Sequence, residues 1–112
     1  MKVNVLRSLE AQAKGVIGRH DLDPDEVFVF PDVHEGLAFH MRTVPFDICI
    51  AFLDRDYEIL QVDRMAAETG NAVTPAESVL AVEAAAGYFE RHGLKAGMVW
   101  QEIANRAMRG EI

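Results

Sequence analysis

The chain has 112 residues, of which 50% are hydrophobic and 26% are charged, values typical of one soluble globular domain and too apolar for intrinsic disorder. Its 18 acidic and 11 basic side chains give a formal charge of −7, which disfavours binding to nucleic acid and to an anionic membrane surface. No segment approaches the run of about 20 apolar residues that a membrane helix needs. We therefore predict a single domain over residues 1–112 with no nucleic-acid or membrane partner.

The N-terminal sequence indicates a compartment, and the cysteine content limits the kinds of site. The sequence MKVNVLRSLE at the N-terminus lacks the apolar run of a signal peptide, so the chain as written is expected to be cytoplasmic. An envelope location is the alternative if a signal peptide has been trimmed. Cys49 is the only cysteine, which excludes an intrachain disulfide and a multi-cysteine metal site. Its place between Ile48 and Ile50 predicts a buried thiol of low reactivity.

The first elements in chain order are two strands separated by a helix. Residues 3–6 form a short apolar run, and Ser8 can cap a helix that is expected to stop near Gly18. The polar segment 21–26, DLDPDE, contains a central proline and predicts a loop. The β-branched and aromatic run at residues 27–30, ended by Pro31, predicts a strand.

The central part of the chain predicts a strand followed by a hairpin. Residues 37–42 alternate between larger apolar side chains and Ala38, His40 and Arg42, which predicts a strand with His40 and Arg42 on one face. Residues 46–53 are apolar at nearly every position, as in a strand that is covered on both sides. Residues 54–57 offer a turn into a strand at 58–65.

The last part of the chain adds two strands and two helices. Residues 66–75 lack a clear pattern and are predicted to form a loop. The remaining predicted elements are a strand at 78–83, a helix at 84–92 closed by Gly93, a strand near 98–101 and a helix at 102–109. The fold class is thus α+β: a small, curled, mostly antiparallel sheet or barrel of about six strands with two or three helices.

Five short motifs, in this order along the chain, resemble a known family. They are KGVIGR at 14–19, FVFP at 28–31, FHMR at 39–42, IAFLD at 50–54 and AGYFERHGLKAG at 86–97. Together they resemble the bacterial and archaeal family called domain of unknown function 192, over most of the chain. The resemblance implies no reaction, substrate or cofactor, because the family has no established activity.

The chain departs from that family's pattern around its central strands. His40 stands where the family usually has tryptophan, and Arg42-Thr43 replaces lysine-asparagine, so positive charge is kept while an aromatic ring and an amide are lost. The carboxylate of Asp47 lies two residues earlier than the family's usual aspartate, which keeps it on the same strand face.

Arg19, His40, Arg42 and Asp47 are the candidate ligand-binding residues. Guanidinium and imidazole groups beside a carboxylate can hold a small polar or anionic ligand, or a partner segment, in a shallow concavity overhung by residues 66–75. We also predict that Arg19 contacts a carboxylate, with Asp47 as the expected partner. The structural alternative is that the Arg19–Asp47 pair only ties a helix to the sheet and that His40 is solvated.

Two other functions compete with a non-catalytic binding module. One is an enzyme that uses Asp47 and His40 as an acid-base pair, which requires both groups at one substrate atom. The other is a self-associating module, with a homodimer formed through Trp100 or through a sheet edge; the alternative for Trp100 is closure of the core. The sequence assigns no catalytic residue, no cofactor and no metal site, because His20, His34, His40 and His92 lack the spacing of metal ligands.

Overall fold

The computed structural model describes residues 1–8, 11–12, 15–19 and 21–112. Its main sheet has five strands in the order β1-β2-β7-β4-β5, and β3 and β6 form a separate two-stranded sheet. The strands are β1 (Lys2–Val5), β2 (Glu26–Pro31), β3 (Ala38–His40), β4 (Ile48–Leu53), β5 (Ile59–Met65), β6 (Asn71–Val73) and β7 (Leu80–Ala85). Two helices, α2 (Tyr88–Arg91) and α3 (Gln101–Met108), follow the last strand. The predicted α+β class is confirmed.

The sheet is mostly antiparallel, as predicted, with one parallel pair. β2 pairs with β7, β7 with β4, and β4 with β5 in antiparallel register, whereas β1 runs parallel to β2. β1 and β5 are the outer strands of the order, so the main sheet is open and the barrel alternative does not hold. The predicted hairpin is present as β4 and β5.

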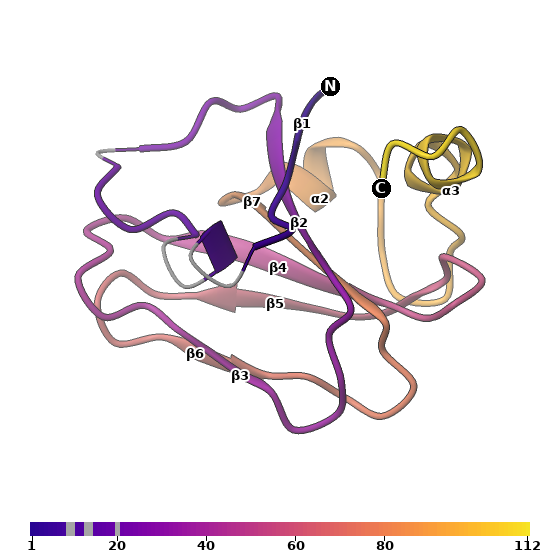
Figure 1. Ribbon diagram of the computed structural model, residues 1–112. Coiled ribbons are helices and arrows are strands. Elements are labelled where there is room, and N and C mark those ends of the chain that lie inside the picture. Colours follow the sequence, from indigo (N-terminus) through magenta and orange to yellow (C-terminus); the bar gives the residue numbers. More distant parts are fainter. Residues whose placement is uncertain (9–10, 13–14, 20) are drawn as a thin grey trace.

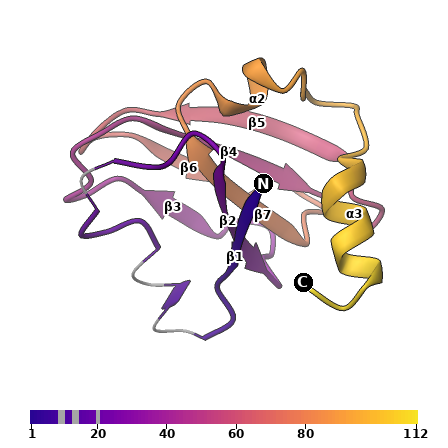
Figure 2. The same cartoon turned by 90° about the horizontal axis from the view of Figure 1, so that it is seen from above.

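Both faces of the main sheet are buried, and the alternation along each strand divides its side chains between two cores. In β4, Ile48, Ile50 and Phe52 join one core, while Cys49, Ala51 and Leu53 join the other. This explains why the segment is apolar at every position. Figures 1 and 2 show the small β3–β6 sheet on one side of the main sheet and α2 and α3 on the other.

Three predicted elements differ from the structure. Residues 66–75 were expected to form a loop, but Asn71–Val73 within them form β6, which pairs with β3. The expected strand near 98–101 is reduced to a single bridge between Glu58 and Val99, because α3 begins at Gln101. The helix expected at 84–92 begins at Tyr88, because Ala84 and Ala85 still belong to β7.

The predicted helix after Ser8 falls partly outside the described residues. Residues 11 and 12 are helical, and residues 15–18 form turns. The Ser8 hydroxyl accepts a hydrogen bond from the Ala11 backbone N–H at 3.0 Å, which confirms Ser8 as a cap. Residues 9, 10, 13, 14 and 20 are not described.

Candidate functional site

A cavity of about 320 Å³ lies against the face of the main sheet that β3 also covers. Apolar groups form most of its lining, with a few polar side chains. The lining consists of Gln12, Gly15, Val16, Ile17, Phe30, Pro31, Asp32, Val33, Leu37, Ala38, Phe39, His40, Val44 and Glu83. We call this space the Glu83 cavity. A mainly apolar cavity with few polar groups is the usual form of a small-molecule site.

Glu83 is the unusual member of this lining. It occupies the fourth position of β7, LAVEAA, and shares a sheet face with Ala81. Its direct neighbours across the two flanking strands are Phe28 on β2 and Ile50 on β4, and neither side chain can donate a hydrogen bond. A carboxyl group has therefore been placed in the middle of an apolar surface.

The side chain of Glu83 is buried, and one of its carboxyl oxygens lacks a partner among the described residues. Only 5% of the residue is exposed, and its Oε1 atom has no hydrogen-bond partner among the residues that the structure describes. Burial raises the pKa of Glu83 from 4.5 to about 7, because the charged form loses its hydration. At neutral pH, this carboxyl group is close to the midpoint of its titration.

Gly15 allows the chain to pass close to this carboxyl group. Its φ of +45° favours glycine, and a Cβ atom added there would lie 3.7 Å from Glu83 Oε1 and 3.5 Å from Phe30 Cζ. A larger side chain at residue 15 would therefore occupy space beside the carboxylate. Gly15 keeps that space open.

Arg19 binds a different carboxylate from the one expected. Its Nη1 atom lies 2.9 Å from Glu26 Oε1, and its guanidinium group lies over the Phe28 ring, 4.7 Å from the centroid. The prediction that Arg19 contacts a carboxylate is confirmed, but the choice of Asp47 was wrong. Glu26 is the first residue of β2, seven residues after Arg19 in the chain, and the two side chains meet there.

Asp47 belongs to another surface. Its Oδ2 accepts a hydrogen bond from Arg64 Nη2 at 2.6 Å, and its Oδ1 accepts one from the Ala67 backbone N–H at 2.7 Å. The hydrogen bond from Arg64 is the main reason that the pKa of Asp47 is lowered. Both oxygens are thus held by local partners.

The four predicted binding residues are not gathered in one described cavity. His40 is exposed on β3 and lines the Glu83 cavity, but Arg19, Arg42 and Asp47 are not part of that lining. β3 ends at His40 and Arg42 lies in the following turn, so the two do not share a regular strand face. Their binding role stays a prediction.

Sequence reasoning missed Glu83. The strand was expected at residues 78–83, which placed the acidic side chain at its polar end. The available signal was the continued apolar sequence Ala84-Ala85 after Glu83. An acidic residue enclosed on both sides by small apolar residues in a strand is expected to be buried, and a buried acid needs an explanation.

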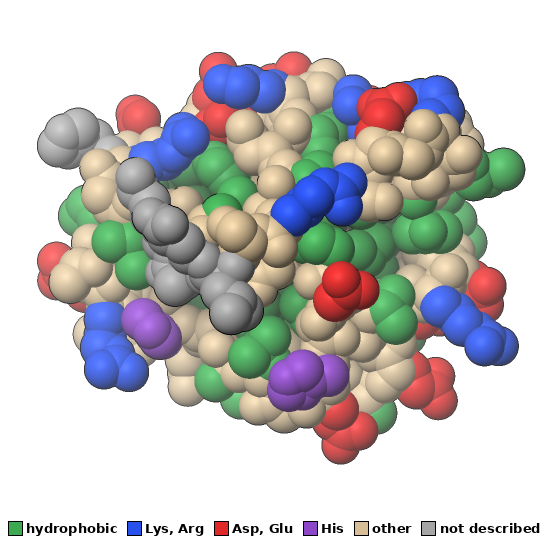
Figure 3. All heavy atoms as spheres, viewed as in Figure 1, with side chains coloured by type: hydrophobic (Ala, Val, Ile, Leu, Met, Phe, Trp, Pro, Cys, Tyr) green, Lys and Arg blue, Asp and Glu red, His purple; other side chains and the backbone are tan. Residues whose placement is uncertain are grey.

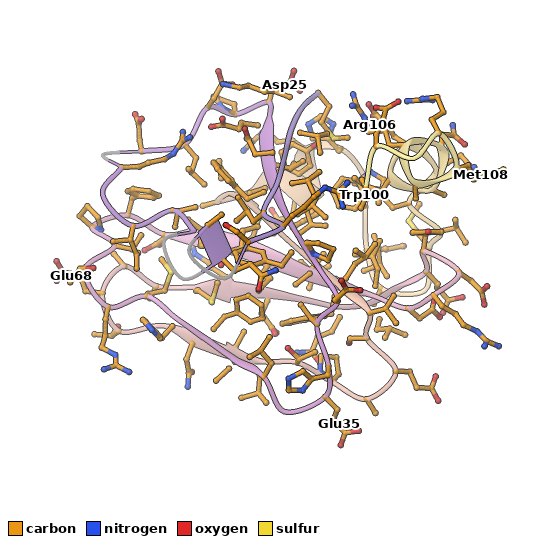
Figure 4. The ribbon with its side chains drawn as sticks, in the orientation of Figure 1. Asp25, Glu35, Glu68, Trp100, Arg106 and Met108 are labelled. Atoms are coloured by element: carbon orange, nitrogen blue, oxygen red, sulfur yellow. The ribbon has the colours of Figure 1, made fainter. Side chains whose placement is uncertain are left out.

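Cys49 and Trp100 pack on the opposite face of the sheet from the cavity. The Cys49 thiol donates to the Ala85 carbonyl oxygen at 3.1 Å, and burial raises its pKa. Trp100 is only 4% exposed and meets Phe89 edge to face, with ring centroids 5.4 Å apart. Trp100 therefore closes the core, as the structural alternative had it. Figure 4 shows it inside the fold, whereas Met108 on α3 points outward.

On the face shown in Figure 3, acidic and basic side chains are scattered among hydrophobic ones. Within the described part of the chain, no group of three or more His, Cys, Asp or Glu side chains is arranged to hold a metal ion. The same residues include no helix that is long and apolar enough to cross a membrane.

A family model described as "Uncharacterized ACR", DUF192, matches residues 1–101. The chain belongs to the DUF192 family. The predicted resemblance is confirmed over most of the domain. No curated protein matches the chain.

Two solved structures share the fold of this DUF192 domain. A protein of unknown function from Novosphingobium aromaticivorans DSM 12444 has a TM-score of 0.71 at 24% identity, covering 85% of this chain and 70% of that one. A proposed transcription regulator from Sinorhizobium meliloti 1021 has a TM-score of 0.73 at 17% identity, covering 85% of this chain and 76% of that one. At these identities the likeness shows the fold alone.

Proposed function

We propose that this DUF192 domain is a small non-catalytic binding module that takes a ligand with a polar group into the Glu83 cavity. The observation that supports the proposal is a carboxyl group, 5% exposed, that lines a mainly apolar cavity with no described partner for Oε1. The proposal replaces the expected centre of the site, Arg42 and Asp47, by Glu83, and it keeps His40 as part of the lining.

A buried carboxyl oxygen without a hydrogen-bond donor reduces stability, and Glu83 Oε1 has no donor among the described residues, so its presence calls for a reason other than folding. A buried glutamate costs free energy relative to an apolar side chain in either protonation state. The charged form loses its hydration, and the neutral form has to be protonated at a pH where the free acid would be ionised. The neighbouring inward position on the same strand is Ala81, which is fully buried. A ligand that supplies the missing hydrogen-bond donor would recover part of this cost on binding.

A binding role is better supported than the acid-base enzyme. Asp47 is engaged by Arg64 and Ala67 and does not share the described cavity lining with His40. Proton-transfer catalysis needs both groups within hydrogen-bond reach of the same substrate region. A ligand can be held by one buried carboxyl group alone, so binding at Glu83 needs no acid-base partner.

The proposal is tested by an NMR screen of the 15N-labelled domain against a mixed set of small amines, alcohols and carboxylates. We expect compounds to shift the backbone amides of lining residues such as Phe39 and Val33. Ala38→Leu adds volume to an exposed residue of the lining and should weaken these responses.

Val73→Leu is the matched control for that variant. Val73 is exposed and lies directly across the strand pair from Ala38, but it is outside the described cavity lining. It should leave binding unchanged. Shifts confined to residues distant from the cavity, or equal losses in Ala38→Leu and Val73→Leu, would contradict the proposal.

A further inference from the structure

We propose that the ligand of the Glu83 cavity is an organic amine in its protonated form, with an apolar body, and that its ammonium group donates a hydrogen bond to the Glu83 carboxylate. This inference rests on the proposed function and narrows it to one class of ligand. The charge of the lining, its aromatic groups and the burial of the carboxylate support this inference.

The charge of the cavity favours a cation. Its described lining contains the acidic residues Asp32 and Glu83 and no lysine or arginine. A carboxylate or phosphate ligand would lose hydration there without gaining a positively charged partner from that lining. An ammonium group would meet an opposite charge at Glu83, in surroundings that screen the attraction less than water does.

The apolar part of the cavity suits the remainder of such a ligand. Phe30 and Phe39 both line the cavity and pack edge to face, with ring centroids 5.1 Å apart. Aromatic rings bind hydrocarbon groups by contact and also attract cations toward their faces. Val16, Val33 and Val44 add buried aliphatic surface. The lining therefore combines one anionic group with a hydrophobic wall.

A neutral hydrogen-bond donor and an ammonium group differ in how their binding depends on the protonation state of Glu83. An alcohol can bond to the carboxyl group in either protonation state, whereas an ammonium group gains most from the ionised state. Burial raises the pKa of Glu83 to about 7, so binding of a cation should release a proton and should strengthen as pH rises through this value. An alcohol should show little such dependence.

Other charged groups near Glu83 define the necessary controls. Asp32 and His40 line the same cavity, and Arg19 lies over Phe28, the cross-strand neighbour of Glu83. Arg19 is paired with Glu26, and Asp32 is the second acidic residue of the described lining. His40 needs a control variant of its own, because its imidazole is the other ionisable group of the lining that can carry a positive charge.

The test uses 3-phenylpropylamine, 3-phenylpropanol and 3-phenylpropionate, which share one apolar skeleton and differ at the polar group. Affinities are measured by NMR titration of the whole chain at about pH 6 and about pH 8. We expect the amine to bind about tenfold more tightly than the alcohol at the higher pH. Its affinity should fall by about tenfold at the lower pH, as Glu83 becomes protonated.

Variants identify the group responsible. Glu83→Gln keeps the size of the side chain and should bring the amine and the alcohol to within about twofold of each other at both pH values. His40→Asn removes the imidazole and should preserve the pH dependence of amine binding. The second variant keeps the test informative if Glu83→Gln does not fold.

The outcomes separate this inference from the proposed function. Equal binding of amine and alcohol to the wild-type cavity, or tightest binding of the propionate, would overturn the amine assignment and leave a ligand-binding cavity in place. Loss of the pH dependence in His40→Asn would overturn the role of Glu83. If none of the three compounds shifts the cavity amides, the inference fails, and the broader screen with Ala38→Leu decides separately whether the proposed function fails.

Discussion

Two buried glutamates on adjacent strands of one sheet have opposite environments. Glu26 opens β2 and is 1% exposed, while Glu83 lies within β7 and is 5% exposed. The Oε1 atom of Glu26 is 2.9 Å from Arg19, and its Oε2 is 3.3 Å from Lys2 and 3.0 Å from the Asn4 amide nitrogen. Glu83 Oε1 has no partner among the described residues. Burial of an acid therefore does not by itself indicate a binding site.

The difference has a geometric cause. Glu26 lies beside the first residues of β1 and near Arg19, so the long side chains of Lys2 and Arg19, which are 69% and 42% exposed, can reach it from the surface. Glu83 lies between β2 and β4, with Phe28 and Ile50 on either side. Local partners stabilise the first carboxylate. Glu83 Oε1 has no such partner among the described residues.

The largest expected effect is the pH dependence that Glu83 gives to folding. Its pKa is raised by burial from 4.5 to about 7, so between these values the folded state holds the proton more tightly than the unfolded state. The contribution of Glu83 to stability is therefore largest below this range and falls as pH rises through it, by about 3 kcal/mol in total. Urea unfolding at several pH values measures this loss.

Glu83→Gln is the matched variant for that experiment. It should remove this part of the pH dependence while leaving the contributions of the other groups in place. A pH profile of Glu83→Gln that matches the wild type would contradict the raised pKa of Glu83.

The next effect concerns the paired glutamate. Arg19→Ala should lower the free energy of unfolding by about 2 kcal/mol, because Glu26 Oε1 would remain buried without its donor. The expected loss is below that of a fully buried ion pair, since Arg19 is 42% exposed and Glu26 keeps Lys2 and Asn4. Denaturant unfolding at neutral pH provides the measurement.

Arg19→Lys is the control for charge. It keeps a cation near Glu26 but loses the planar group that stacks on Phe28, so its loss should be smaller than that of Arg19→Ala. Equal stability of the wild type and Arg19→Ala would show that the Glu26 cluster does not depend on this ion pair.

A third test compares the two faces of the main sheet. Cys49 packs on the face opposite the cavity and is 6% exposed. A thiol reagent should modify it at least about tenfold more slowly in the folded protein than in denaturant, because access and the thiolate fraction are both reduced. Absorbance of the released reagent product gives the rates. Equal rates would show that this face opens readily.

The smallest effect is expected at Asp47. Its carboxylate is paired with Arg64 on an exposed surface, where solvent screens the interaction. Asp47→Asn should change stability less than Arg19→Ala does, and it should leave amine binding to the Glu83 cavity unaltered. A loss of amine binding in this variant would return the site to the residues first predicted from the sequence.

The elements that could be predicted from the sequence are those with a clear pattern of apolar residues. β2 and β4 were recognised because both faces of the main sheet are covered and their residues are almost all apolar. β6 was missed because it has three residues, of which only Ala72 is buried. So short a strand depends on its pairing with β3 rather than on a local pattern.

The site was harder to predict than the fold because it depends on partners that are distant in sequence. Arg19 pairs with Glu26 rather than Asp47, and nothing in the spacing of these residues distinguishes the two carboxylates. The isolation of Glu83 follows from the register that places it between Phe28 and Ile50. Register is fixed by the whole sheet and cannot be read from one strand.

The position of Trp100 supplies a built-in optical probe. It is the single tryptophan of the chain, and it contacts Phe89 and Tyr88 in the core on the far side of the sheet from the Glu83 cavity. Its fluorescence emission should be blue-shifted in the folded protein and should move to longer wavelength on unfolding, as the indole meets water. Because the sheet separates the indole from the cavity, the same emission should stay constant while a ligand is titrated, so one sample can report folding and binding through independent signals.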